Sequence, residues 1–148
     1  MNIKDTNCIE HVREQANGRC ENCGRPGNHV HHIWAKGMGG SPIDLPINNV
    51  NLCHVCHSIH HSGGHPTRLE LIAIVEKREG WKSLEIEEEI YRVRQLPKGA
   101  EYRPTRPFAT YHRYRRDSDG VQRAADPPGL GCGRPGVAFD EGGWFRLV

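Results

Sequence analysis

One stretch, residues 20–61, contains the motifs from which the fold is predicted: residues 20–23 read CENC, residues 30–33 read VHHI and residues 48–61 read NNVNLCHVCHSIHH. Four of the six cysteines and most of the ten histidines lie within it. Each Cys-x-x-Cys pair places two thiolates on one tight turn, and four such soft ligands suit a closed, tetrahedral Zn²⁺ site. The spacing therefore predicts a structural zinc ion bound by Cys20, Cys23, Cys53 and Cys56.

The histidines of the same stretch indicate a second kind of site. His57 and His61 are four residues apart and would share one face of a helix, which is a good spacing for two imidazoles on one metal ion. His31 or His32 could complete a three-histidine site with open positions for water and phosphate. Two rival pairs remain open on spacing, namely His57 with His60 and His61 with His65. A surface patch of histidines that binds no metal is the alternative.

Taken together, these features resemble the motif of the HNH nucleases. The resemblance rests on VHHI at residues 30–33, the GMGG loop at residues 37–40, Asn48, and the pattern L-C-x-x-C-H-x-x-x-H at residues 52–61. The two cysteine pairs resemble the four-cysteine zinc site of bacterial and phage members of that family. The resemblance covers residues 15–65 and implies a ββα-metal core, in which two strands and a helix surround a catalytic metal ion.

By the pattern of that family, His31, His57 and His61 would bind one catalytic divalent ion. Imidazole ligands favour Zn²⁺, Ni²⁺ or Mn²⁺ over Mg²⁺, whereas the family is often dependent on Mg²⁺ or Mn²⁺. Hydrolysis of a phosphodiester needs an activated nucleophile and stabilisation of the charge that develops on phosphate and leaving oxygen. A site of three histidines with open positions suits that chemistry.

The same resemblance implies roles for His32 and Asn48. His32 would be the general base that takes a proton from the attacking water, and Asn48, nine residues before the first helix histidine, would hold that base in position. Asn49 and Asn51 are neighbouring alternatives for this asparagine. Because successive strand side chains point to opposite faces, His31 and His32 can serve one site only if the strand twists or ends there.

Local signals predict the elements around this core, which together make an α+β fold with flanking helices. The predicted elements are a helix over 8–17 capped by Asn7 and Glu10, a strand over 27–33, a loop over 36–49, a short strand near Val50, a helix over 52–61, a helix from the Thr67/Glu70 capping box to Gly80, and a helix from a cap at Ser83 to Pro97. Cys8 has no partner at ligand spacing and is interpreted as a buried apolar residue. The acidic run at 85–89 is interpreted as a solvated helix face.

Beyond residue 97 the periodicity ends and the composition changes. Residues 98–116 combine six basic residues and one acidic residue with several aromatic rings, which suits a nucleic-acid arm or a tail that only adds solubility. Residues 117–148 are rich in glycine and proline and are expected to be disordered. The predicted DNA contacts are Lys36, Arg103, Arg106, Arg113, Arg115 and Arg116.

These patterns divide the chain into a zinc-containing HNH domain at 1–65, a helical extension at 66–97 and an irregular tail at 98–148. We expect an endonuclease that nicks or cuts DNA. A homodimer and a complex with phage or restriction proteins are both compatible with the sequence. A catalytically silent zinc module that binds nucleic acid or protein is the alternative, and a nuclease-derived toxin or accessory subunit is another. The first residues contain no apolar run of a secretory signal, so we expect a cytoplasmic protein with no membrane partner.

Overall fold

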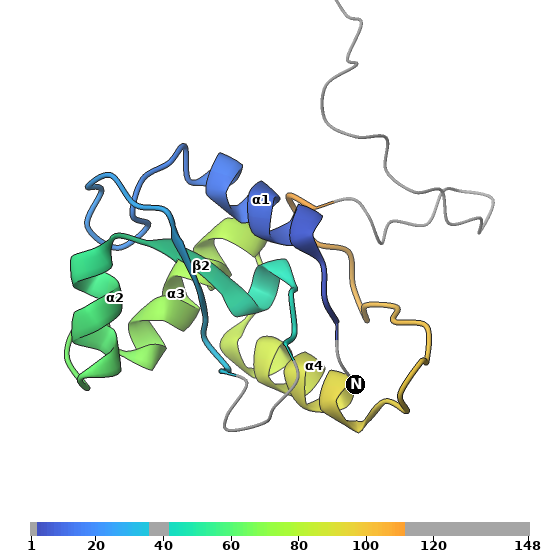
Figure 1. The fold of residues 1–148 in the computed structure, drawn as a ribbon. Coiled ribbons are helices and arrows are strands. Elements are labelled where there is room, and N and C mark those ends of the chain that lie inside the picture. The colour runs from blue at the N-terminus through green and yellow to red at the C-terminus, as the bar shows by residue number, and fades with distance from the viewer. Residues whose placement is uncertain (1–2, 36–41, 112–148) are drawn as a thin grey trace, which may run out of the picture.

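The computed structural model describes residues 3–35 and 42–111. Within them the chain forms, in order, α1 (Thr6–Gln15), β1 (His29–His32), the short 3₁₀ helix η1 (Pro46–Asn48), β2 (Asn49–Leu52), α2 (His54–His61), α3 (Arg68–Glu79) and α4 (Ser83–Gln95). Figure 1 shows the strands in the middle of the fold, with α1 on one side, α3 and α4 on the other, and α2 at one end. The predicted α+β class is confirmed, as a small two-stranded sheet among helices. Over the described ranges, each helix is either too short or too polar to cross a membrane.

The two strands form an antiparallel hairpin that ends close to the predicted histidines. His31 pairs with Val50 and His32 pairs with Asn49. β1 is shorter than the predicted strand over 27–33, and it ends at His32. Every residue of β2 is buried, because α1 and α3 both pack against this strand.

The two asparagines of β2 are buried by tying their amides to backbone carbonyls. Asn49 donates through Nδ2 to the carbonyl of Leu45 at 2.9 Å. Asn51 donates through Nδ2 to the carbonyls of Arg19 at 2.9 Å and Gly27 at 2.8 Å. The NH₂ groups are thus satisfied, as buried polar groups generally are, whereas the two Oδ1 atoms have no hydrogen-bond partner within the described residues. The bonds of Asn51 fasten β2 to the segment that carries the first cysteine pair, and the bond of Asn49 fastens it to the residue before η1.

Helix α1 begins earlier than the sequence predicted because a different residue caps it. The predicted cap was Asn7 with Glu10, but the carboxylate of Asp5 accepts the backbone N–H of Cys8 at 3.3 Å and is the N-cap. A side-chain oxygen at this position satisfies a backbone donor that has no partner inside the helix. Cys8 and Val12 are buried beneath the helix, and the prediction that Cys8 is a buried core residue is confirmed.

Specific residues fix both ends of α3 and the start of α4. The predicted capping box of α3 is present, since Thr67 and Glu70 exchange side-chain and backbone hydrogen bonds. The helix ends at Gly80, whose φ of +70° favours glycine. The prediction that Ser83 caps α4 is wrong, because its hydroxyl donates to the carboxylate of Glu76 in α3 at 2.7 Å.

Residues 98–111 belong to the folded domain, contrary to the prediction of a tail from residue 98 onward. Tyr102, Phe108 and Tyr111 are all buried in the core. Phe108 stacks on Trp81 with ring centroids 5.5 Å apart. Three of the rings that suggested a nucleic-acid arm are therefore core residues, because burying large aromatic side chains is strongly favourable. Residues 112–148 of the predicted tail lie outside the described residues.

Two buried glutamates hold residues 98–111 against the helices. Glu89 of α4 accepts from the hydroxyl of Tyr102 at 2.8 Å and from the hydroxyl of Thr105 at 3.0 Å. Glu79 of α3 accepts from the hydroxyl of Thr110 at 2.8 Å. Both glutamates are 2% exposed. The prediction that the acidic run of α4 is a solvated face is thus wrong for Glu89, whose carboxylate is satisfied inside the fold.

Candidate functional site

Four cysteine sulfurs come together where the first loop meets the start of α2. The Sγ atoms lie within 4.8 Å of one another, and they belong to Cys20, Cys23, Cys53 and Cys56. The sulfurs of Cys23 and Cys53 are 3.7 Å apart. Four sulfurs bound to one zinc ion at about 2.3 Å with tetrahedral angles would be about 3.8 Å apart. The predicted clustering is confirmed, and the spacing fits a single tetrahedral ion and not a disulfide, whose sulfurs are about 2.05 Å apart.

The second cysteine pair is built into the first turn of α2. Cys53 is the N-cap, and its sulfur accepts the backbone N–H of Cys56 at 3.4 Å. Asn22 donates through Nδ2 to the sulfur of Cys56 at 3.3 Å. The backbone hydrogen bond lowers the pKa of Cys53 to about 7, whereas burial raises the pKa of Cys56 to about 12. Because zinc binds the thiolate form, N–H donors aimed at sulfur and a helix N-terminus suit a metal centre here.

Two glycines allow the two cysteine loops to approach each other. Gly24, just after the first pair, has a φ of +73°, a backbone conformation that favours glycine. A Cβ atom at Gly27 would lie 2.8 Å from the backbone nitrogen of Cys53 and 2.8 Å from the carbonyl carbon of Leu52. Since neither contact is with a flexible side chain, a larger residue at 27 would push the first loop away from α2.

Three histidine side chains converge between β1 and α2. His31 from the strand and His57 and His61 from the helix each offer a ring nitrogen within 4.8 Å of the others. The Nε2 atoms of His57 and His61 are 3.3 Å apart. Two nitrogens held about 2.0–2.1 Å from one ion at a tetrahedral angle would be about 3.3–3.4 Å apart. The structure thus brings together the three histidines that the resemblance selects as metal ligands, in a spacing that fits one ion.

The environment of His31 supplies a separate sign that the group has room for a ligand. Its side chain is buried, and its Nε2 atom has no hydrogen-bond partner within the described part of the chain. Burial, together with the neighbouring His60 and His57, lowers the pKa of His31 to about 3. A neutral imidazole offers the lone pair that a metal ion needs. Because a buried, unpaired polar atom costs about 1–3 kcal/mol, an ion bound at this nitrogen would remove that cost.

The rival histidines of α2 and the following loop have other partners. His60 donates through Nδ1 to the carbonyl of Pro66 at 2.7 Å, although its ring lies near that of His31. His65 is exposed, and its Nδ1 lies 2.9 Å from a carboxylate oxygen of Glu70. The alternative of a surface patch does not describe His31, since that side chain is 5% exposed.

His32, the next residue along β1, contacts a different partner. Its Nε2 atom lies 2.7 Å from Oδ1 of Asp44, a residue that is buried. Side chains alternate along a strand, so His31 reaches the histidines of α2 while His32 reaches the loop before η1. Asp44 is a partner that the sequence did not predict. It lies 12 residues from His32 in a proline-containing loop, and no spacing pattern marks it.

Asn48 closes the base of the loop between β1 and η1. Its Oδ1 accepts the backbone N–H of Trp34 at 2.9 Å, and its Nδ2 donates to the carbonyl of Ile43 at 2.9 Å. Trp34 follows His32 by two residues, and Ile43 directly precedes Asp44. The fully buried Asn48 side chain therefore fixes the backbone on both sides of the His32–Asp44 pair.

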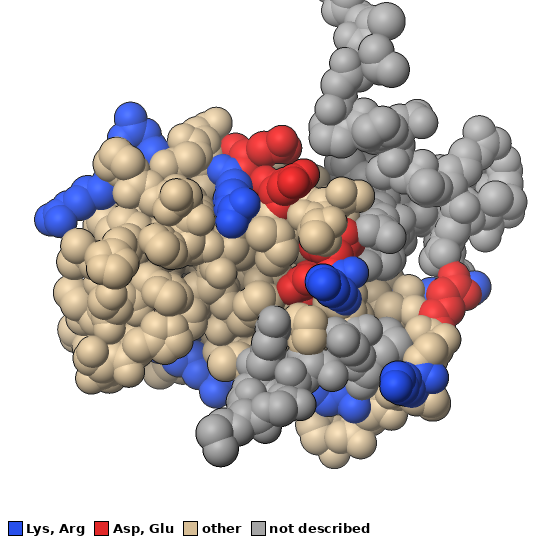
Figure 2. All heavy atoms as spheres, viewed as in Figure 1, with Lys and Arg blue, Asp and Glu red and all other residues tan. Residues whose placement is uncertain are grey.

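The described members of the predicted DNA-contact set are paired within the protein. Arg103 lies 2.8 Å from a carboxylate oxygen of Glu101, and Arg106 lies 3.0 Å from one of Glu85. Such exposed pairs are worth about 0–1 kcal/mol each and exchange readily. On the face drawn in Figure 2, basic and acidic side chains are interspersed. The remaining predicted contacts, Lys36, Arg113, Arg115 and Arg116, lie outside the described residues.

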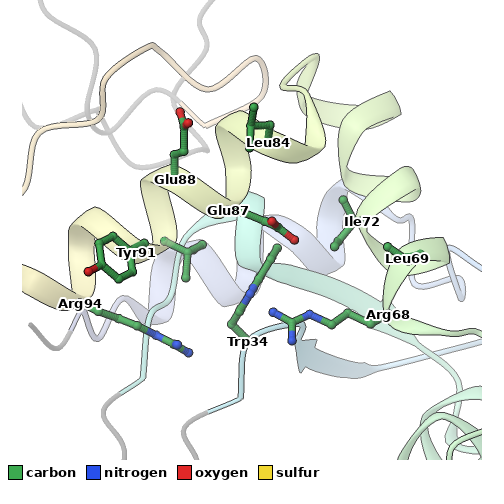
Figure 3. Close-up of a pocket in the computed structure, with 10 residues that line it drawn as sticks. Trp34, Arg68, Leu69, Ile72, Leu84, Glu87, Glu88, Tyr91 and Arg94 are labelled. Carbon is green, nitrogen blue, oxygen red and sulfur yellow. The ribbon is translucent and has the colours of Figure 1, made fainter.

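A surface groove of about 590 Å³ lies beside the loop that follows β1. Figure 3 shows Trp34 between α3 and α4, with Arg68 reaching over it from α3 and Arg94 extending towards it from α4. The guanidinium of Arg68 is 4.5 Å from the centroid of the Trp34 ring, a cation–π contact. The side chains lining the groove include neither the four clustered cysteines nor the three clustered histidines, so the groove is separate from both candidate metal centres.

No family model matches this sequence, and no curated protein matches it. The case for a function therefore depends on the chemistry of the two residue groups and on their geometry.

Proposed function

We propose that this protein is a metal-dependent endonuclease of the HNH type that hydrolyses phosphodiester bonds of DNA. In this proposal the four cysteines hold a structural zinc ion and the three histidines hold a catalytic divalent ion. The observation that carries the proposal is the convergence of His31, His57 and His61 within 4.8 Å. A further histidine, His32, lies next to His31 in β1 and has a buried carboxylate partner. This histidine is the candidate base, and its presence supports the proposal.

In the proposed reaction, the three clustered histidines would hold the metal ion and His32 would act as the base. A divalent ion held by the three histidines would, when bound, stabilise negative charge on the phosphate and on the departing oxygen. His32 would accept a proton from water while the water oxygen bonds to phosphorus. The bond from phosphorus to the 3′ oxygen then breaks, and that oxygen leaves with the bonding electron pair and takes a proton from solvent. The products are a 5′ phosphate and a 3′ hydroxyl.

The ligand set narrows the choice of catalytic metal. Three imidazoles and no carboxylate favour Zn²⁺, Ni²⁺ or Mn²⁺ over Mg²⁺. Because the described chain contains one such histidine group, each copy would cut one strand. Cutting both strands would then need a homodimer or two successive nicks. Choice of a cutting site would come from weak preferences or from a partner protein.

A plasmid-nicking assay tests the proposal. Zinc-loaded protein is incubated with supercoiled DNA and, in separate reactions, Mg²⁺, Mn²⁺, Ni²⁺ or Zn²⁺, and the nicked circle is measured. We expect His57→Ala and His32→Ala to lower the nicking rate by about 10²-fold or more. His54→Ala is the matched control, because this exposed histidine lies on the same helix outside the ligand group.

Two results would refute the proposal. One is wild-type protein that nicks with none of these ions while it still binds DNA. That outcome would favour the alternative of a catalytically silent zinc module that binds nucleic acid. The other is equal nicking by wild-type protein and His57→Ala protein of the same folded fraction, since the histidine group would then have no part in the reaction.

A further inference from the structure

Asp44 connects the proposed base to the interior of the fold. The carboxylate side chain is 7% exposed and the His32 side chain 21% exposed, so the contact between them is shielded from water on the carboxylate side. The distance of 2.7 Å between Nε2 of His32 and Oδ1 of Asp44 is that of a strong hydrogen bond. An ionised carboxylate can only accept, so the proton in this bond belongs to Nε2.

The orientation of this carboxylate is set by a second donor. The backbone N–H of Asp5 donates to Oδ2 of Asp44 at 2.9 Å. The backbone of Asp44 is held in turn, because its N–H donates to the carbonyl of Ile3 at 2.8 Å. Asp5 is itself fixed by the hydroxyl of Tyr111, which donates to its carboxylate at 2.8 Å. Oδ2 of Asp44 thus accepts from a backbone N–H whose position is fixed by the fold, and Oδ1 faces His32.

We infer that Asp44 is a positioning residue that selects the tautomer of His32, keeping the proton on Nε2 and the lone pair on Nδ1. This inference rests on the proposed function, in which His32 takes a proton from water. A neutral imidazole has one donor and one acceptor nitrogen. With Nε2 committed to Asp44, Nδ1 is the nitrogen that can accept the proton of the attacking water. The carboxylate would also stabilise the imidazolium that forms.

The replacement Asp44→Asn should reverse the tautomer with little change in shape. The backbone N–H of Asp5 needs an acceptor, so it selects the amide oxygen and leaves the amide NH₂ facing His32. Nε2 must then accept a hydrogen bond, and the ring proton moves to Nδ1. Because a base with a proton on its working nitrogen cannot accept another, we expect kcat for nicking to fall about 10²- to 10⁴-fold. KM should stay within about twofold, since the Asp44 side chain is buried and offers almost no surface to a substrate.

Nitrogen-15 NMR of the His32 ring measures the tautomer independently of catalysis. The zinc-loaded protein is studied without DNA and without a second metal. We expect the proton on Nε2 in the wild type and on Nδ1 in Asp44→Asn. Glu14→Gln is the control, because it neutralises an exposed carboxylate of α1 by the same kind of replacement; the tautomer and the nicking rate should remain those of the wild type.

The two measurements separate the possible failures. A wild-type ring with its proton on Nδ1 overturns the inference, and this result needs no variant that folds. An unchanged tautomer in folded Asp44→Asn also overturns it, even if nicking is lost. If the tautomers are as expected but the wild-type protein fails to nick DNA with any of the four ions, the proposed function is wrong. The catalytic role of the His32–Asp44 pair is then overturned with it.

Discussion

Replacing Glu89 by glutamine should weaken the attachment of residues 98–111 to the helices. The Glu89 carboxylate accepts five hydrogen bonds, of which one comes from the backbone N–H of Thr105 to Oε1 at 3.4 Å. Oε1 accepts from Arg92 at 2.6 Å and from Tyr102 at 2.8 Å, and Oε2 accepts from Arg92 at 3.0 Å and from Thr105 at 3.0 Å. Glutamine has nearly the same shape but only one acceptor oxygen, so its NH₂ group must face two donors.

The expected loss follows from the character of these bonds. A hydrogen bond to a charged group contributes about 1.5–3 kcal/mol, and removing one member of a buried ion pair costs about 3–5 kcal/mol. The side chain of Arg92 is 36% exposed, so its charge can return to water, which reduces the loss. We therefore expect Glu89→Gln to lower the free energy of unfolding by about 2–3 kcal/mol.

Urea unfolding of the zinc-loaded protein measures this change, and amide hydrogen exchange shows where it acts. The control is Glu88→Gln, an exposed residue of the same helix, which should change stability by at most about 0.5 kcal/mol. In Glu89→Gln the amides of 98–111 should exchange faster than those of β2. A loss below about 0.5 kcal/mol with unchanged exchange would refute the claim that Glu89 fastens this segment.

Four further predictions concern pH, the metal ligands and the loop backbone. Burial opposes ionisation of Glu89, but hydrogen bonds from its partners outweigh burial and hold the pKa below the ordinary 4.5. The resulting stabilisation is present above pH 4.5 and is lost as the pH falls through the lowered pKa. In acid, the free energy of unfolding should therefore depend less on pH in Glu89→Gln than in the wild type. Cys20→Ser should lower zinc content and unfold the domain, whereas Cys8→Ala should keep its zinc, because only Cys20 is in the sulfur group; equal zinc content by mass spectrometry would contradict this. Gly27→Ala should cost about 1–3 kcal/mol, since its Cβ would lie 2.8 Å from backbone atoms; unchanged thermal stability and zinc affinity would show that the loop can move. Asn48→Ala should cost about 2–3 kcal/mol by removing two bonds of 2.9 Å between buried groups; calorimetry that finds no loss would remove its role in closing the loop.

Several features of the protein follow from short-range pattern in the sequence. Spacing of three residues predicts that each cysteine pair shares a turn, and spacing of four predicts that His57 and His61 share a helix face. The capping box at Thr67 and Glu70 has the same local character. These predictions agree with the structure because the atoms concerned are joined by a few rotatable bonds, so the local backbone conformation largely determines their distance.

Predictions based on composition succeeded less well. The acidic run in α4 and the mixture of arginine and aromatic residues after residue 97 both suggest solvent-exposed segments. In the structure Glu89 accepts the hydroxyl of Tyr102 inside the fold. Composition describes the environment that each residue prefers on its own. A charged carboxylate can nevertheless be buried when hydrogen-bond donors from another segment satisfy it.

The amino-acid sequence is enough to identify the candidate ligands, four cysteines and a set of histidines, and the local turns and helices that bring pairs of them together. The packing of separate segments decides how the two neighbours His31 and His32 divide, one buried against α2 and the other bonded to Asp44. It also decides that Tyr111 supports Asp5 across 106 residues of chain. Such contacts depend on how separate segments pack together, and their partners are set by the shape and polarity of the interior, which no spacing within one segment encodes.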